Sequence, residues 1–221
     1  KIINGLWGQG QMSFCKAIVV VDKDTAPHNT EKIIKKFLTG FDITSDIILA
    51  KGVLDVLDHS SPYPNFGTKI GIDLTHRFKN EPPERKKRIL KSTSDTDELL
   101  NVLNTSLPSP VKSRYLFKEV SEKENTPNRI LAVCVQKEKN FAGKDLSEII
   151  FNISELELFN IIILFDIKID LNDNSLILWK LFNNVDPGRD MFFNKDRLVI
   201  DACKKGELDG HKREWPDELL F

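Results

Sequence analysis

The chain has 221 residues, 29% of them charged, and a formal net charge of −1 at pH 7. This length allows one large domain or two small ones with a buried core, and the charge balance gives no electrostatic basis for binding nucleic acid or an anionic membrane. No apolar run reaches the length of a membrane span, and the three cysteines form no Cys-x-x-Cys pair. We expect a cytoplasmic protein without a disulfide framework, an integral membrane segment or a signal peptide.

The first part of the chain predicts a strand, a helix and further strands. Glycines 5, 8 and 10 form a turn before Ala17–Val21, an apolar run that ends at Asp22 and is typical of a strand buried on both faces. A helix is predicted from Thr30, capped by Asn29 or Thr30 itself and ended by Gly40. Further extended segments are predicted at 46–50, 54–57 and 69–73, with a loop over 58–68.

Residues 79–128 have the composition of a linker or insert. The basic run Arg85–Arg88 lies among acidic residues and prolines, which favours a solvated linker over a nucleic-acid site. One short amphipathic helix is predicted at 95–104 and one strand at 115–117.

The last part of the chain predicts alternating strands and helices. The strands are expected at 130–135, 161–165, 191–193 and 198–200, and the helices at 145–153 and 173–183. Such alternation implies parallel pairing through right-handed crossovers. The sequence therefore predicts an α/β fold, a layered αβα domain with a mostly parallel sheet.

The two parts also resemble each other. An offset of 144 places 18–51 on 162–195 with seven identities in 34 ungapped positions, whereas chance would give about two. Ile200–Asp201 corresponds to Ile72–Asp73 at a shorter offset of 128, because the second copy lacks the 54–69 loop. We interpret this as an internal duplication of a strand–helix–strand unit. We expect a first unit over 1–78, the insert over 79–128, and a second unit with a tail over 129–221, all in one compact domain.

By the same symmetry, the first copy should have a strand and a helix before Lys1. The chain does not begin with methionine, so we expect it to be a fragment of a longer protein.

Several motifs have a chemical interpretation that the structural one outweighs. The glycines at 5, 8 and 10 precede a strand, whereas a phosphate-binding loop follows one and opens a helix. Asp58-His59-Ser60 contains the letters of a hydrolase triad but has no nucleophile elbow. The four histidines lack the spacing of zinc ligands.

Two aspartate patterns are also more simply structural. Asp186–Asp190 predicts a turn with an arginine–aspartate ion pair. Asp22 and Asp166 end corresponding strands, where α/β folds place ligand groups, but their presence in both copies favours a role in the shared fold. The residues alone therefore define no catalytic, cofactor-binding or metal site.

Four blocks of the sequence nevertheless resemble one known family. They are Gly5–Met12 with the strand that runs on to Asp22, Val53–Ser61, Gly67–Asp73 and Arg213–Pro216. In family order, these blocks resemble the carboxy-terminal domain of the UbiD family, the 3-octaprenyl-4-hydroxybenzoate carboxy-lyases and related aromatic-acid decarboxylases. The likeness covers about 1–78 and 160–217. Residues 79–159 and the second copy depart from ordinary short members and resemble longer members with a duplicated tail.

The resemblance implies a parent enzyme that uses prenylated FMN with a divalent metal and K⁺. The family's acid–base and flavin-binding residues precede this domain, so the resemblance places none of them here and implies an inactive fragment without bound cofactor. By position, Met12, Ser13, Phe14, Val53 and Leu54 would line the substrate pocket, although ordinary core or turn packing would also explain them. Apolar side chains suit a dry slot for an aromatic ring. The second copy lacks this segment and is expected to serve structure or oligomerisation.

Two functional classes remain open. The first is a substrate-capping and assembly domain of a prenylated-FMN-dependent carboxy-lyase in quinone biosynthesis. Its partners would be the upstream flavin-binding domain of the same chain, an aromatic acid such as a 4-hydroxybenzoate, and further copies in a homo-oligomer. The second is a non-catalytic α/β binding or regulatory module that retains the fold.

Overall fold

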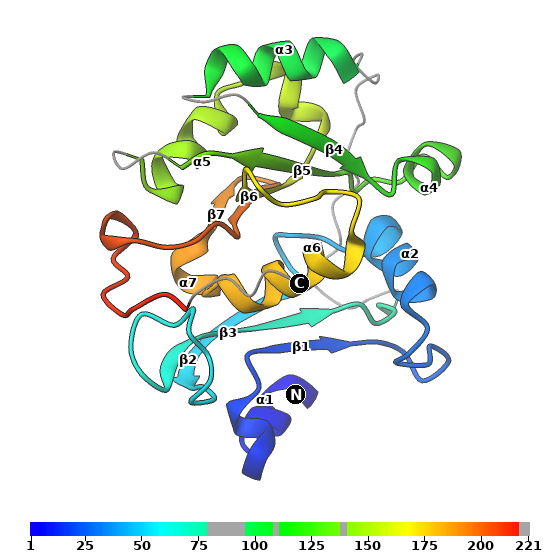
Figure 1. The fold of residues 1–221 in the computed structure, drawn as a ribbon. Helices are drawn as coiled ribbons and strands as arrows, with labels where there is room; N and C mark the ends of the chain where they lie inside the picture. Colours follow the sequence, from blue (N-terminus) through cyan, green and yellow to red (C-terminus); the bar gives the residue numbers. More distant parts are fainter. Residues whose placement is uncertain (79–95, 108–110, 138–140, 217–221) are drawn as a thin grey trace.

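The computed structural model describes residues 1–78, 96–107, 111–137 and 141–216. These residues form two β-sheets that lie one above the other, with helices between them and on their outer faces (Figure 1). None of the described helices is long and apolar enough to cross a membrane. The described part of the chain is thus a mixed α/β structure with two sheets.

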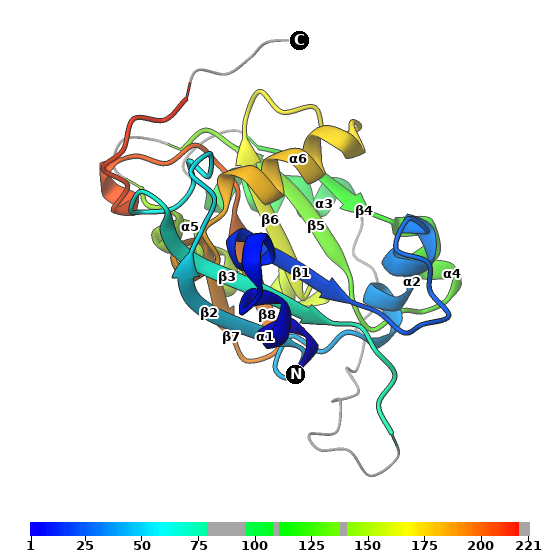
Figure 2. The same cartoon turned by 90° about the horizontal axis from the view of Figure 1, so that it is seen from below.

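The smaller sheet has the strand order β1-β3-β2. Its strands are β1 (Ala17–Val20), β2 (Ile47–Val53) and β3 (Phe66–Asp73), and its helices are α1 (Ile2–Trp7), the 3-10 helix η1 (Gly10–Phe14) and α2 (Thr30–Gly40). Asn29 caps α2, because its side chain accepts a hydrogen bond from the backbone N–H of Lys32 at 3.0 Å. Seen from below, α1 lies in front of this sheet, on the face turned away from the larger sheet (Figure 2).

The larger sheet has the strand order β4-β5-β6-β8-β7. Its strands are β4 (Lys112–Leu116), β5 (Ile130–Val135), β6 (Ile161–Asp166), β7 (Met191–Asn194) and β8 (Arg197–Asp201). The helices of this part are α3 (Thr96–Ser106), α4 (Lys118–Lys123), α5 (Gly143–Phe151), η2 (Ser154–Leu158), α6 (Asn174–Asn184), α7 (Pro187–Asp190) and η3 (Glu207–Asp209). The predicted helix at 95–104 is confirmed as α3, and the strand predicted at 115–117 begins earlier, as β4.

The larger sheet separates two hydrophobic cores. Alternate side chains of β5 and β6 point to opposite faces, as the period of a strand requires. One set, which includes Ala132 and Ile163, packs between the sheets with Leu38 of α2 and Ile177 of α6. The other set packs against α3 and α5 on the outer face. Burying an aliphatic side chain of this size contributes about 1.5–3 kcal/mol, so both faces of the larger sheet need a cover, and the two sheets share the inner core.

The expectation of a mostly parallel sheet is not met. Three strand pairs are parallel (β1–β3, β5–β6 and β6–β8), and three are antiparallel (β2–β3, β4–β5 and β7–β8). For β2–β3 and β7–β8 the reason lies in the connections, because strands joined without an intervening helix run antiparallel. β7 and β8 are joined by a tight turn, in which Lys195 has φ +56°, as such hairpin turns require.

A second expectation fails at 54–57, where no strand forms. The Asp55 side chain accepts the backbone N–H of Leu57 at 2.9 Å, and the backbone N–H of Asp58 donates to the Asp55 carbonyl at 3.0 Å. An aspartate that binds its own downstream backbone favours a turn, so the apolar residues here do not extend β2.

Both sheets contain the same three-strand arrangement. In the smaller sheet, β1 runs parallel to β3, and β2 pairs antiparallel with the other side of β3. In the larger sheet, β6 runs parallel to β8, and β7 pairs antiparallel with the other side of β8. The registers agree as well: Ala17 lies opposite Ile70, and Ile161 lies opposite Leu198. These pairs are related by the offsets 144 and 128 found in the sequence.

Aspartates at corresponding positions make the same contacts in both units. Two of these side chains accept a backbone N–H from the segment after the last strand, Asp22 from His76 at 2.9 Å and Asp166 from Lys204 at 3.0 Å. The other two accept a backbone N–H that closes a turn, Asp46 from Asp42 at 2.9 Å and Asp190 from Asp186 at 2.8 Å. These aspartates therefore hold the shared fold, as the sequence favoured.

Candidate functional site

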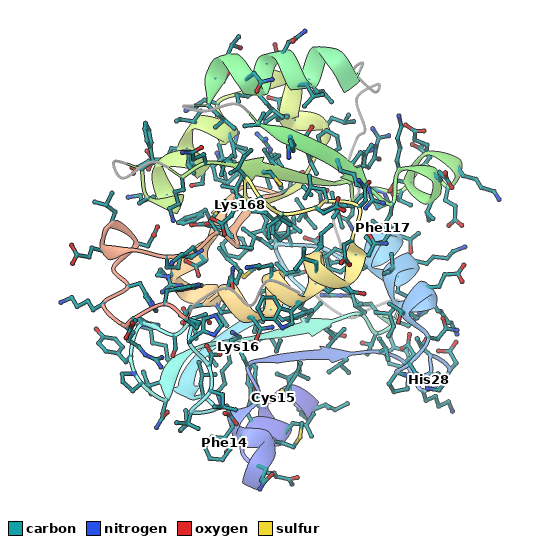
Figure 3. The ribbon with its side chains drawn as sticks, in the orientation of Figure 1. Phe14, Cys15, Lys16, His28, Phe117 and Lys168 are labelled. Carbon is teal, nitrogen blue, oxygen red and sulfur yellow. The ribbon has the colours of Figure 1, made fainter. Side chains whose placement is uncertain are left out.

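The five predicted pocket residues lie in two segments of the first unit. Met12, Ser13 and Phe14 belong to η1, and Val53 ends β2, with Leu54 next to it. The exposed fractions are 43% for Met12, 43% for Phe14 and 48% for Val53, but 1% for Leu54. In Figure 3, Phe14 lies beside α1 at one end of the molecule, whereas Lys16, a little further along the chain, lies nearer the middle.

Lys69 of β3 connects these two segments. Its ammonium group donates to the carbonyl of Ser13, lies 5.9 Å from the centre of the Trp7 ring, and its side chain passes beside Gly52 of β2. Lys69 is 4% exposed. Burial lowers its pKa overall, although the nearby Cys15 side chain acts in the opposite direction and raises it. The lysine thus fixes η1 against β2. It was not among the residues predicted for the pocket.

A residue at the equivalent position of the second unit indicates that Lys69 stabilises the fold. Arg197 stands at the equivalent position by the offset that also relates Ile72 to Ile200. It lies 5.5 Å from the centre of the Phe151 ring and donates to the carbonyls of Phe151 and Leu156 at 3.2 Å each. Both cations satisfy carbonyls where a helix ends, which the helix dipole favours. A role in positioning η1 therefore explains Lys69 without a catalytic step.

Leu54 lies apart from the exposed residues. A Cβ atom placed on Gly67 would come within 2.8 Å of Leu54 Cδ1, so the leucine packs against the bare backbone of β3. The same Cβ would come within 2.5 Å of Asp186 Oδ2. Gly67 is therefore needed for the close approach of Leu54 and α7 to β3.

The loop after Leu54 is held by charge rather than by a catalytic relay. Lys16 Nζ lies 2.8 Å from Asp58 Oδ2 and donates to Ser60 Oγ at 2.8 Å, while Ser60 Oγ donates to Asp58 Oδ1 at 2.7 Å. Burial raises the pKa of Asp58, but Lys16 and the hydrogen bonds from Ser60 and Ser61 outweigh it and lower the pKa overall. His59 lies instead against Trp215, with ring centres 4.9 Å apart. The structure therefore forms no Ser-His-Asp triad here, as the sequence analysis concluded.

The C-terminal tail and α7 join this loop to the second unit. Arg213 donates to the Asp58 carbonyl at 2.9 Å and to Ser61 Oγ at 3.0 Å. The backbone N–H of Thr68 donates to Asp186 Oδ2 at 2.8 Å, and Ser60 Oγ lies 3.2 Å from the Val185 carbonyl oxygen. These contacts fix the loop that follows the candidate pocket residues.

The predicted ion pair in α7 is confirmed. Arg189 binds Asp190 through two parallel hydrogen bonds of 2.7 Å, and its third nitrogen lies 3.1 Å from Nδ1 of His211. Burial raises the pKa of Asp190, which Lys205 and Arg189 oppose. Burial and the charge of Arg189 lower the pKa of His211 to about 4. Within the described ranges, no group of three or more His, Cys, Asp or Glu side chains could hold a metal ion.

Comparison with known proteins extends these observations. Two Helicobacter pylori proteins of uncharacterised function, from strains J99 and 26695, are 32% and 33% identical over 222 and 224 residues. Each alignment covers 99% of this chain and 33% of the relative, so the chain spans about a third of the length of these relatives. An Archaeoglobus fulgidus protein is 37% identical over 87 residues, 39% of this chain and 18% of that protein.

Two solved structures are similar in part. The vanillic acid decarboxylase of Sedimentibacter hydroxybenzoicus in its closed form has a TM-score of 0.40 and 18% identity, covering 56% of this chain and 28% of that one. An evolved dimeric form of the UbiD-class enzyme HmfF from Pelotomaculum thermopropionicum, in complex with prFMN, has a TM-score of 0.40 and 13% identity, covering 73% and 40%. Both TM-scores are below 0.5, so the assignment of the family rests on sequence.

The sequence evidence covers both units. The model of the 3-octaprenyl-4-hydroxybenzoate carboxy-lyase C-terminal domain matches residues 1–74 and 113–212 and leaves 75–112 and 213–221 unmatched. The expectation that 79–159 depart from the family is therefore wrong for 113–159, and the block Arg213–Pro216 lies outside the match. The match includes every described strand of the two sheets except the first residue of β4. With well over half of its residues matched, the chain belongs to the family of C-terminal domains of the 3-octaprenyl-4-hydroxybenzoate carboxy-lyases.

Proposed function

We propose that this domain caps the substrate site and supports the assembly of a prenylated-FMN-dependent carboxy-lyase that acts on an aromatic acid. The observation that carries the proposal is the family match over both units. A 4-hydroxybenzoate-type precursor of a quinone is the substrate that this family suggests. We also propose a cytoplasmic location and a homo-oligomeric parent enzyme.

The surface of the first unit supports a capping role. Met12, Phe14 and Val53 present apolar side chains that are about half exposed, and Lys69 and Trp7 hold the backbone beneath them. Trp7 contributes further by donating its Nε1–H to the Cys15 carbonyl at 3.0 Å. A slot that holds an aromatic ring against a cofactor needs apolar groups on a rigid backbone, and η1 provides both. Leu54 would contribute from below, as packing that supports Val53.

Prenylated FMN, the divalent metal and K⁺ would be bound by the flavin-binding domain of the parent enzyme. The resemblance places the family's acid–base and flavin-binding residues before this domain, and the described residues hold no group of three or more His, Cys, Asp or Glu side chains that could bind a metal ion. We therefore assign to this chain no step that involves the cofactor, only the exclusion of water and the orientation of the ring.

The second unit is proposed to serve assembly, and to have arisen from the first by duplication. Matching strand order, register and aspartate contacts support the common origin. Leu178, Trp179 and Phe182 of α6 are 46%, 53% and 46% exposed, which leaves an apolar surface suited to a contact with another domain or subunit.

The capping role can be tested in the full-length enzyme by truncating Phe14 and Val53 to alanine, one at a time. We expect kcat/KM to change selectively between two aromatic acids of different ring size, by about 1–3 kcal/mol per side chain. Phe193→Ala is the matched control, because it removes an equally exposed phenylalanine from β7, outside the α6 surface proposed for assembly. It should leave the selectivity unchanged.

The melting temperature separates the capping role from ordinary packing. Phe14→Ala and Val53→Ala should change it little, whereas Leu54→Ala should destabilise the protein by about 2–5 kcal/mol, as expected for an emptied core site. Unchanged selectivity in Phe14→Ala and Val53→Ala would contradict the capping role and favour the alternative of a non-catalytic binding or regulatory module.

A further inference from the structure

The correspondence between the two units extends upstream of their first strands. The 3-10 helix η2 (Ser154–Leu158) precedes β6 as η1 (Gly10–Phe14) precedes β1, and both ends of the two elements are related by the offset 144 found in the sequence. α5 precedes η2 as α1 precedes η1, and the helices end at the equivalent positions Phe151 and Trp7. The cations Arg197 and Lys69 lie over these two aromatic rings. The segments that lead into β1 and β6 are thus built alike.

The two strands differ in what lies on their other edge. β6 is bordered by β8 on one side and by β5, in parallel, on the other. β1 is bordered by β3 alone among the described strands. The consequence is visible in burial: Ile163 of β6 is 5% exposed, whereas Val19, at the equivalent position of β1, is 42% exposed.

The direction of the backbone groups shows what the open edge offers. The carbonyls of Lys16 and Val20 accept hydrogen bonds from Ile70 and Leu74, both at 2.8 Å. In a parallel pair every second residue bonds to the same neighbour, so Ala17 and Val19 direct their N–H and C=O groups away from β3. The Ala17 carbonyl accepts a hydrogen bond from the Cys15 thiol at 3.1 Å, so the edge offers the two N–H groups and the Val19 carbonyl. In the second unit, the residue equivalent to Ala17 uses this direction, because the backbone N–H of Ile161 donates to the Arg129 carbonyl at 3.2 Å.

We propose that a parallel β-strand of the same polypeptide, from the residues that precede Lys1, binds the free edge of β1. The second unit fixes its place. Lys1 corresponds to Asp145, so the strand should lie as far before Lys1 as β5 (Ile130–Val135) lies before Asp145. The connection through α1 would repeat the β5–α5–β6 crossover. The Helicobacter pylori relatives, about three times as long as this chain, have the additional length that such a strand requires.

The side chains of the strand follow from the same comparison. β5 is buried along its whole length, from Ile130 to Val135. A strand that covers Val19 should therefore be a short, predominantly apolar run, as buried parallel strands are. It would also end the exposure of an unprotected sheet edge, which proteins avoid because such edges pair with other chains.

Residue-resolved amide hydrogen exchange on the full-length protein tests this proposal. The amides of Ala17 and Val19 should exchange at least about 100-fold more slowly than unstructured amides, and so should those of Ile161 and Ile163, which lie between two strands. Ile18 and Val20, which pair with β3 in any case, are the internal controls. Fast exchange at Ala17 and Val19 beside protected Ile18 and Val20 would overturn the proposal. Protection that disappears on dilution would assign the edge to a second copy and would overturn it too.

A backbone variant gives an independent test. Val19→Pro removes the N–H that points to the proposed strand, and Val19→Ala keeps the N–H although it removes more of the side chain. If the strand is present, Val19→Pro should lower the melting temperature of the full-length protein well below that of Val19→Ala, as Ile163→Pro should relative to Ile163→Ala. Equal melting temperatures for the two Val19 variants would show an open edge, where proline is tolerated.

Discussion

The two units share a backbone plan but differ in how deeply their charged groups are buried. Asp22 pairs with Lys36 at 2.6 Å near the surface, and its pKa is lowered by the hydrogen bonds from Lys36 and His76. Its equivalent Asp166 has a raised pKa, because burial outweighs the hydrogen bond from Lys204. The pKa of the aspartate at this position is therefore lowered in the first unit and raised in the second. The comparison teaches that the hydrogen bonds to the backbone are the same in the two units, while the surroundings of each carboxylate differ.

The strongest test of this contrast removes the equivalent carboxylates Asp190 and Asp46. Asp190→Ala should lower the free energy of unfolding by about 3–5 kcal/mol, because it takes a carboxylate from two cations, Arg189 and the fully buried Lys205. Asp46→Ala should cost less, about 1–3 kcal/mol, because its partner Arg77 has a partly exposed side chain. Urea denaturation of both variants measures the difference. Equal losses would show that the two sites are energetically alike.

Removal of Arg197 should also lower the free energy of unfolding more than removal of its equivalent in the first unit, Lys69. Arg197→Met removes a donor from three carbonyls of the α5–η2 segment, those of Ile150, Phe151 and Leu156, and should cost about 1.5–3 kcal/mol. Lys69→Met loses one carbonyl contact but relieves the burial of an ammonium group, so we expect a loss of about 1 kcal/mol or less. Thermal denaturation of the two methionine variants checks this order, and a larger loss for Lys69→Met would reverse it.

The second unit should also carry a pH dependence that depends on its tail. The pKa of His211 is about 4 in the folded protein, below its ordinary value of 6.5, so the unfolded chain binds more protons between these two values. Stability from this group is therefore complete above pH 6.5 and decreases as the pH falls toward 4, by about 2 kcal/mol between pH 7 and pH 5. His211→Gln should remove this part of the pH dependence. His59, whose pKa is also lowered by burial, remains in the variant and serves as the internal reference. An unchanged pH profile would contradict the prediction.

The smallest effect should be equal in the two units. Asn29 caps α2 through one backbone N–H, and Asp173 caps α6 through two, at 2.9 and 3.0 Å. Replacement of either residue by alanine should cost about 1 kcal/mol, with the aspartate slightly ahead. Chemical denaturation of the two variants is the measurement. A difference of more than about 1 kcal/mol would mean that one of the helices depends on its cap for more than local stability.

The sequence predicts the elements of this fold better than their directions. The helices α2 and α6 follow from their caps and apolar periodicity, and β1, β5, β6 and β8 follow from continuous apolar runs. Strand direction depends on whether a connection crosses the sheet, and alternation of strands and helices alone did not reveal the β2–β3 and β7–β8 hairpin pairs. The turn at 54–57 was missed because Asp55 binds its own backbone there.

The candidate pocket segment shows a similar limit. Resemblance indicates Met12, Phe14 and Val53, but burial separates Leu54 from them, and only coordinates give burial. Lys69 was missed because a lysine inside a strand is usually solvated on an outer face. One signal in the sequence would have pointed to Lys69: it corresponds to the cation Arg197 by the same offset of 128 that relates Ile72 to Ile200.

The contacts of Arg213 have a consequence for the order in which the chain acquires its shape. The arginine binds the carbonyl of Asp58 and the hydroxyl of Ser61 across 155 and 152 residues of sequence. Contacts so distant in sequence are slow to form, because the intervening chain must first be ordered. During synthesis, the contacts of Arg213 with the loop next to Val53 can therefore form only after nearly the whole second unit has emerged from the ribosome. A nascent chain shortened before Arg213 would carry both sheets but an unfinished edge beside the candidate pocket residues.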